Sequence, residues 1–120
     1  MTRALVVKVT CGPEDAERLN QAFTVAAAAA AAGAPVSLWL TGEAAWYGVP
    51  GRAEAFDLPL ATPLATLRDT VLAMGTLTVC TQCAARREIG EADLVPGARI
   101  AGAAVFAEEV LADGAQALVY

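Results

Sequence analysis

Short segments of apolar and β-branched residues recur along the chain and alternate with longer segments of helical periodicity. The short segments predict five strands, which start near Leu5, Val36, Leu77, Arg99 and Ala117. Because the first of them is almost wholly apolar, we expect it to be a central strand covered on both faces. Strands that alternate with helices predict an α/β fold, with a parallel sheet between two layers of helices.

Three longer segments carry the helical pattern. The first follows the turn Gly12-Pro13-Glu14-Asp15 and ends before Gly33. Its predicted buried face consists of Leu19, Phe23, Ala26, Ala27 and Ala30. The second begins at Thr62 and Pro63 and ends at Gly75, with an apolar face made of Leu64, Leu67, Val71 and Met74. The third spans residues 103–112 and offers Phe106, Val110 and Leu111 to the core.

The remaining segments predict shorter features. Residues 42–47 form a short helical turn after the second strand, on which Trp46 and Tyr47 are expected to pack in the core or against another subunit. Residues 48–59 contain two glycines and two prolines, so they are predicted to be a loop with at most a brief extended piece at residues 56–58. The whole chain, residues 1–120, is expected to form a single domain.

Charge and composition narrow the classes of partner. The chain has 8 basic and 13 acidic residues, and Lys8 is its only lysine. With no basic stripe, nucleic acid and anionic membranes are not expected as partners. The apolar fraction of 57% leaves little polar surface for a small monomer, which favours a homo-oligomer with a buried interface. The longest apolar run, 25–34, is too short to cross a membrane.

The cysteine and histidine counts exclude several kinds of chemistry. Cys11, Cys80 and Cys83 are an odd set without a secretory signal pattern, so we expect a cytoplasmic protein with free thiols. The absence of histidine excludes Cys-His and Ser-His-Asp catalysis within this chain. Three thiolates lack the fourth ligand of a structural zinc site, and no nucleotide-binding motif is present, so neither a metal nor a cofactor is expected.

The segment Leu77–Arg87 combines the features of a reactive site. It is predicted to change from strand to helix at Cys80, with Thr81 as the N-cap. Open α/β sheets place their ligands at this carboxyl edge, and the positive end of a helix dipole favours a thiolate. Cys83 follows one turn later and shares a helix face with Arg86 and Arg87.

Each candidate has a simpler interpretation. Most free cysteines are small buried apolar residues, and this applies to Cys11, Cys80 and Cys83 alike. Arg86 and Arg87 could stabilise a thiolate, or they could lie on a solvated helix face. An ideal helix rises about 1.5 Å per residue, which puts Arg86 roughly 9 Å from Cys80 along the axis. A positive charge at Cys80 would then need a long side chain that folds back or a neighbouring subunit.

Three pieces of the chain resemble the DsrE/DsrF/TusD-like sulfur-relay family. They are the turn at residues 12–15 with Arg18, Ala22 and Phe23 after it, the stretch Val36–Glu43, and Cys80 followed by Arg86, Arg87 and Ile89. The resemblance implies a three-layer α/β/α sandwich whose five-stranded parallel sheet has the order 4-3-2-1-5, in trimers or hexamers. It also maps the sulfur-accepting cysteine of the family onto Cys80. Two departures are Glu88, where glycine is common, and the additional Cys83.

The resemblance implies a persulfide-carrying sulfurtransferase-like protein that takes sulfur from a donor protein and passes it to an acceptor. Two other functions remain open from the residues. One is a dithiol oxidoreductase with Cys80 attacking and Cys83 resolving, and the other is a non-catalytic binding module. In the expected strand order, Cys11 and Cys80 lie at one sheet edge with a strand between them. Two strand spacings of about 4.8 Å exceed the reach of a disulfide, so we expect none between these residues.

Overall fold

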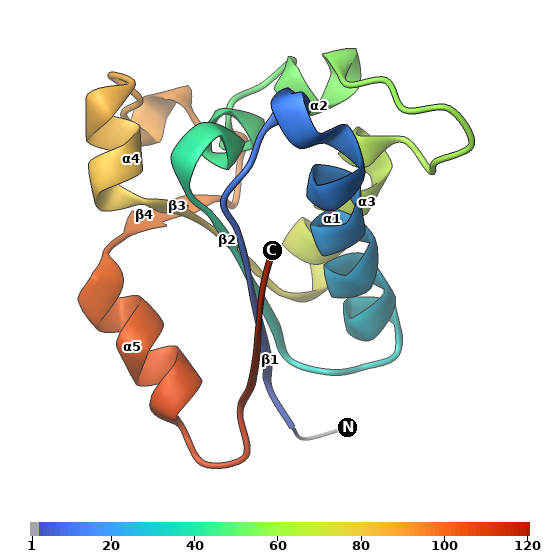
Figure 1. Cartoon of the computed structure of the whole chain (residues 1–120). Coiled ribbons are helices and arrows are strands. Elements are labelled where there is room, and N and C mark those ends of the chain that lie inside the picture. The colour runs from blue at the N-terminus through green and yellow to red at the C-terminus, as the bar shows by residue number, and fades with distance from the viewer. Residues whose placement is uncertain (1–2) are drawn as a thin grey trace.

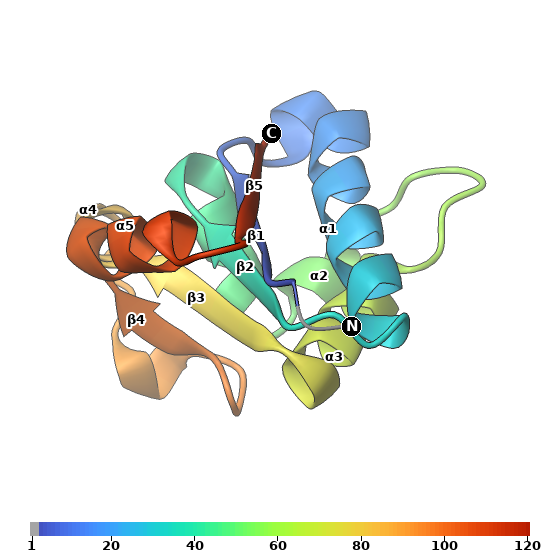
Figure 2. The same ribbon diagram turned by 90° about the horizontal axis from the view of Figure 1, so that it is seen from below.

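The computed structural model describes residues 3–120. Five strands form one all-parallel sheet in the order β4-β3-β2-β1-β5 (Figures 1 and 2). The strands are β1 (Leu5–Val9), β2 (Val36–Leu40), β3 (Thr76–Cys80), β4 (Arg99–Ala101) and β5 (Gln116–Val119). The expected α/β fold and strand order are confirmed, and every strand starts within one residue of its predicted position.

Helices cover both faces of this sheet, and short turns gather at its carboxyl edge (Figure 1). The helices are α1 (Ala16–Ala31), α2 (Arg52–Ala55), α3 (Leu64–Met74), α4 (Thr81–Arg86) and α5 (Ala103–Leu111). Three 3₁₀ turns are η1 (Pro13–Asp15), η2 (Gly42–Gly48) and η3 (Glu91–Asp93). Within residues 3–120, no helix combines the length and the apolar character that crossing a membrane requires.

The face covered by α1 and α3 holds the apolar core. All five residues of the predicted α1 face are buried and belong to the same core cluster. Three of the five are alanines. Small alanine side chains let α1 approach the sheet closely, which keeps Val7 and Val9 fully out of water. On α3, Leu64, Leu67 and Val71 are buried as predicted. Met74 is 53% exposed, because it lies in the last turn beyond the edge of the core.

Helix α5 covers the other face without a buried apolar stripe. None of its side chains is buried, and Leu111 is 80% exposed, so the prediction that Phe106, Val110 and Leu111 enter the core is wrong. The helix contacts the sheet through Phe106, whose ring meets Trp39 edge-on at 5.3 Å between centroids. The Lys8 ammonium lies 5.1 Å from the centre of the same Phe106 ring.

One carboxylate anchors α5 to two strands, β2 and β4. Glu109 Oε1 accepts hydrogen bonds from Ser37 Oγ at 2.6 Å and Trp39 Nε1 at 2.9 Å, and Oε2 pairs with Arg99 at 2.6 Å. Arg99 also donates to Thr78 on β3. Burial raises the pKa of Glu109, but these donors outweigh it and hold the pKa below its ordinary value. On this face a polar network therefore holds the helix to the sheet, as apolar packing does on the α1 face.

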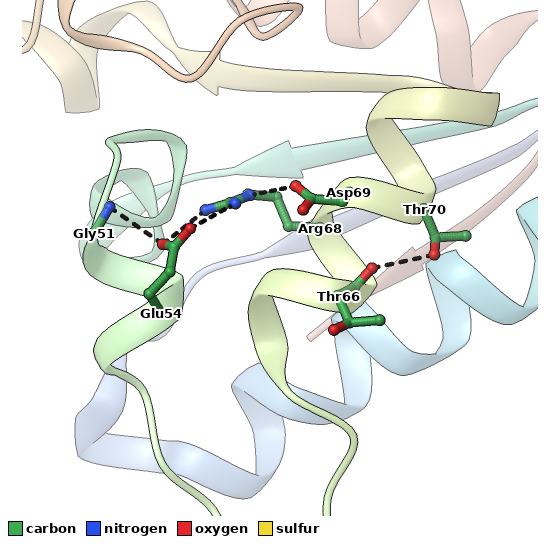
Figure 3. Close-up of polar contacts among 6 residues, drawn as sticks. All are labelled: Gly51, Glu54, Thr66, Arg68, Asp69 and Thr70. Carbon is green, nitrogen blue, oxygen red and sulfur yellow. Dashed lines mark hydrogen bonds and ion pairs between the residues drawn. The ribbon is translucent and has the colours of Figure 1, made fainter.

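Helix α2 lies inside the segment that was predicted to be a loop. Its Glu54 receives two hydrogen bonds from Arg68 of α3, at 3.0 and 2.8 Å, and a third from the Gly51 N–H at 3.2 Å (Figure 3). The Arg68 side chain is only 6% exposed and also pairs with Asp69 at 3.0 Å. The helix thus depends on a partner 14 residues away, which glycine and proline counts do not reveal.

Replacing Glu54 by glutamine should destabilise the fold by about 1–2 kcal/mol near neutral pH, because it leaves a buried guanidinium without its charged partner. Hydrogen bonds from Arg68 lower the pKa of Glu54 from 4.5 to about 2. A lowered folded-state pKa stabilises above the unfolded value, so the contribution is lost as the pH falls from about 4.5 towards 2.

Urea unfolding of wild type and Glu54→Gln at about pH 7 and about pH 3 checks this expectation. Asp69→Asn is the matched control, since Asp69 is more exposed and makes a single bond to Arg68. Equal stabilities of Glu54→Gln and wild type at neutral pH would contradict the assigned role.

Candidate functional site

Cys80 lies where the polypeptide turns from β3 into α4. It is the last residue of β3, paired with Ala101 of β4, and it occupies the N-cap position of α4. Thr81 was predicted to be the N-cap but is the first helical residue, since the extended conformation continues through Cys80. Because α4 has only six residues, the helix dipole is a small contribution here.

The Cys80 thiol points to the α5 face of the sheet. Side chains alternate along a strand, and Thr78 faces α5 because it binds Arg99 of the Glu109 network. Cys80, two residues further on, therefore faces the same side. Lys8 shares this face on β1, where its ammonium lies against Phe106. The Cys80 side chain is half-buried at the carboxyl edge.

Donors around Cys80 favour its thiolate. Burial raises the pKa of the Cys80 thiol, but the N–H and the thiol of Cys83 and the N–H of Gln82 lower it. The positive charge of Lys8 acts in the same direction, and the net effect is a pKa below the usual cysteine value. None of these donors completes a capping hydrogen bond to the thiol in this structure.

The side chain of Cys83, a residue of α4, is buried against η2. Its Sγ accepts a hydrogen bond from the N–H of Gly42 at 3.2 Å. Gly42 has a φ of +55°, and a side chain there would place Cβ 2.6 Å from the Thr10 carbonyl oxygen. Only glycine fits this position, which brings the end of β2 against Cys83. Cys80 is therefore the accessible member of the pair, and Cys83 lies behind it.

The two arginines take separate positions. Arg87 donates to the Cys83 carbonyl at 3.1 Å and pairs with Glu43 of η2 at 3.3 Å, which ties α4 to η2. Arg86 is exposed and forms no ion pair within residues 3–120. Neither side chain is among the groups that shift the pKa of Cys80. The nearby charge comes from Lys8 of the same chain, which the sequence pattern did not single out.

Cys11 follows β1 and packs on the α1 face. It is buried, and its thiol donates to the Asp15 carbonyl at 3.7 Å. Burial raises the pKa of Cys11, and the carboxylates of Asp15 and Glu14 raise it further. All three cysteines are free, so the expectation that Cys11 and Cys80 form no disulfide is confirmed. Strand β2 separates them, as the strand order requires.

The thiols do not form a metal site with other ligands. Across residues 3–120, no group of three or more histidine, cysteine, aspartate or glutamate side chains is arranged to hold a metal ion. The groups that lower the pKa of Cys80 are Cys83, the Gln82 N–H and Lys8.

Comparisons with known proteins place this geometry in a family. The sequence model of the DsrE/DsrF-like family matches residues 4–119. The chain belongs to the DsrE/DsrF-like family. Among solved structures, the YchN protein from E. coli superposes with a TM-score of 0.81 at 19% identity, covering 100% of both chains. MTH1491 from Methanobacterium thermoautotrophicum, described as a protein of unknown function, gives 0.65 at 7% identity, again over 100% of both chains. No curated protein sequence matches the chain.

Replacing Lys8 by methionine should raise the pKa of Cys80, because it removes a positive charge from the thiol's face while keeping the side-chain stem against Phe106. The rate of Cys80 alkylation by iodoacetamide, followed against pH by peptide mass spectrometry, measures this shift. Lys8→Arg keeps the charge and should leave the profile close to wild type. An unchanged profile in Lys8→Met would show that the backbone donors alone set the pKa.

Proposed function

We propose that this DsrE/DsrF-like protein is a sulfur carrier in which Cys80 holds the transferred sulfur. Membership of the family supports a sulfur-relay type of role. The observation that carries the assignment to Cys80 is the contrast between the strand-end thiols. Cys80 is half-buried with a lowered pKa, whereas Cys11 is buried with a raised pKa. Only the first combines access with thiolate character.

The transfer needs no net oxidation. The Cys80 thiolate attacks the outer sulfur of a donor persulfide, R–S–SH, a new S–S bond forms, and the donor leaves as the thiolate R–S⁻. Cys80 then carries the outer sulfur as its own persulfide until an acceptor thiolate attacks it in the same way. Donor and acceptor proteins are the partners that this cycle requires. Cys83 N–H and S–H, with Lys8, supply the positive environment for the anionic sulfur.

A second candidate uses both thiols. Cys83 follows Cys80 by one helical turn and lowers its pKa, which favours a dithiol function as well. There Cys80 attacks a substrate disulfide, releases one thiolate, and Cys83 attacks the mixed disulfide to release the other. The chain is oxidised and the substrate reduced, so a separate reductant of the thiol class would have to regenerate it.

Loading with a persulfide donor separates these functions. Wild type and Cys83→Ser should gain the mass of one sulfur atom in intact mass spectra, and Cys80→Ser should not. Cys11→Ser is the matched control and should load like wild type. Loss of thiol–disulfide turnover in both Cys80→Ser and Cys83→Ser, with no sulfur gained by wild type, would replace the carrier function by the dithiol function. If both variants behave like wild type in both assays, the thiols serve only as packing residues.

We also propose that the chain works as a homo-oligomer, a trimer or a hexamer, in the cytoplasm where its thiols stay reduced. The support is the face formed by α5 and β5, which leaves Leu111 80% and Val119 66% exposed. Helix α5 has no buried residue in the isolated chain. A second copy on this face would cover apolar surface next to the strand that carries Lys8.

Static light scattering should therefore give a trimer or hexamer for wild type at micromolar concentration and a smaller species for Leu111→Glu. The matched control is Leu60→Glu, since Leu60 is fully exposed in the loop before α3. It should leave the assembly intact. A monomeric wild type would refute the proposal, and an intact assembly in Leu111→Glu would show that the α5 face is not the interface.

A further inference from the structure

A cavity on the carboxyl edge lies outside the thiol site. It has a volume of about 270 Å³ and is lined by Pro13, Glu14, Glu43, Trp46, Tyr47 and Arg52. An adjoining cavity of about 270 Å³ shares Pro13, Tyr47 and Arg52 and adds Ala16, Ala55, Phe56 and Asp57. The walls come from the turns that follow β1 and β2 and from α2. Crevices of this kind, outside the carboxyl ends of parallel strands, are where α/β folds bind ligands.

Tyr47 lines both cavities, together with Pro13 and Arg52. The residue is 5% exposed, yet its hydroxyl takes part in none of the side-chain hydrogen bonds of residues 3–120. In this part of the chain, Asn20 Nδ2 is the one fully enclosed side-chain polar atom without a partner, so the Tyr47 hydroxyl keeps access to the opening. Its neighbours include Arg52, Glu14 and Glu43, which places it in the cavity wall. The hydroxyl is thus accessible in the cavity wall without a hydrogen-bond partner among residues 3–120, so it can bond to a ligand there.

Two opposite charges in the same wall are left unpaired. Arg52 stacks on Trp46, with Cζ 4.3 Å from the ring centre, and forms no ion pair within residues 3–120. Glu14 uses Oε1 to accept the Gly12 N–H at 2.7 Å and leaves Oε2 without an ion pair in the same part of the chain. The third charged group, Glu43, is already paired with Arg87. Arg52 and Glu14 thus face one cavity without meeting across it.

Two features set the position of Arg52 in the cavity wall. Arg52 is the first residue of α2, the helix that Glu54 fixes to the buried Arg68 (Figure 3). The Trp46 ring lies against the Arg52 guanidinium. Because Arg52 is exposed, its N–H donors are available to a ligand in the cavity.

We propose that this cavity binds a small zwitterion, a free L-α-amino acid with an apolar side chain. The carboxylate accepts from Arg52 and from the Tyr47 hydroxyl, and the ammonium donates to Glu14 Oε2. The side chain enters the adjoining cavity, whose apolar wall includes Ala55 and Phe56, while Asp57 disfavours an acidic side chain there. A ligand with only one of the two charges leaves either Arg52 or Glu14 unpaired.

Titration of isotope-labelled full-length protein with L-leucine, followed by amide NMR shifts, tests the proposal. L-Leucine should bind and shift the amides of residues 46–55, and leucinamide and N-acetyl-L-leucine should each bind about tenfold more weakly, because each lacks one charge. Absence of any shift with L-leucine at its solubility limit would overturn the proposal. Equal binding of N-acetyl-L-leucine would replace it by a simple anion site, and equal binding of leucinamide by a cation site.

Variants locate the binding. Arg52→Gln, Glu14→Gln and Tyr47→Phe should each weaken L-leucine by about tenfold, and the Tyr47→Phe change removes only the hydroxyl, so the fold is kept. Glu17→Gln is the matched control, an exposed carboxylate on α1 that should bind like wild type. Cys80→Ser should also bind like wild type, since the thiol is not part of this cavity. Wild-type affinity in Arg52→Gln or Glu14→Gln would refute the assigned contacts.

Discussion

Parallel pairing of all five strands is the constraint from which the placement of every reactive group follows. It sends the carboxyl ends of β1, β2 and β3 to one edge, so Cys11, η2 and Cys80 meet there although they are far apart in sequence. The register pairs Lys8 with Trp39 and Trp39 with Thr78. These three side chains form a row on the α5 face of the sheet, from β1 to β3. A shift of one residue in β1 would turn Lys8 towards the apolar core and Val7 towards α5.

The two faces of the sheet give the two strand-end thiols opposite character. On the α1 face, Cys11 is surrounded by apolar side chains and lies near carboxylates, and both raise its pKa. On the α5 face, Cys80 meets N–H donors and the Lys8 ammonium, in a layer that the Glu109 network already keeps polar. Position at a strand end is therefore not enough to lower the pKa of a cysteine. The charges contributed by the neighbouring strand and helix decide the matter.

Sequence periodicity predicted what depends on local chemistry, and the family resemblance supplied the strand order. The strands, the buried face of α1 and the position of α3 just after Pro63 all follow from the residue pattern. Helix α2 was missed because Glu54 depends on Arg68 of another helix, and the exposure of α5 was missed because an apolar pattern does not say which surface remains uncovered. Lys8 was missed as a site residue because only the register brings β1 and β3 onto one face. Arg87 binds the Cys83 carbonyl and Glu43, Arg86 is exposed, and the positive charge that lowers the pKa of Cys80 comes from Lys8.

The position of Cys83 sets the order of events in either use of the thiols. Its sulfur is buried and accepts the Gly42 N–H, and Gly42 lies so close to the Thr10 carbonyl that no side chain fits there. A partner protein therefore reaches Cys80 first, whether it brings a persulfide or a disulfide. Cys83 is held where its N–H and S–H can face a negative sulfur on Cys80. The lowered pKa of Cys80 arises with Cys83 in this position, whereas attack by Cys83 on a mixed disulfide would require its sulfur to leave the Gly42 hydrogen bond. The resting geometry accordingly favours the donor role of Cys83 over the resolving role.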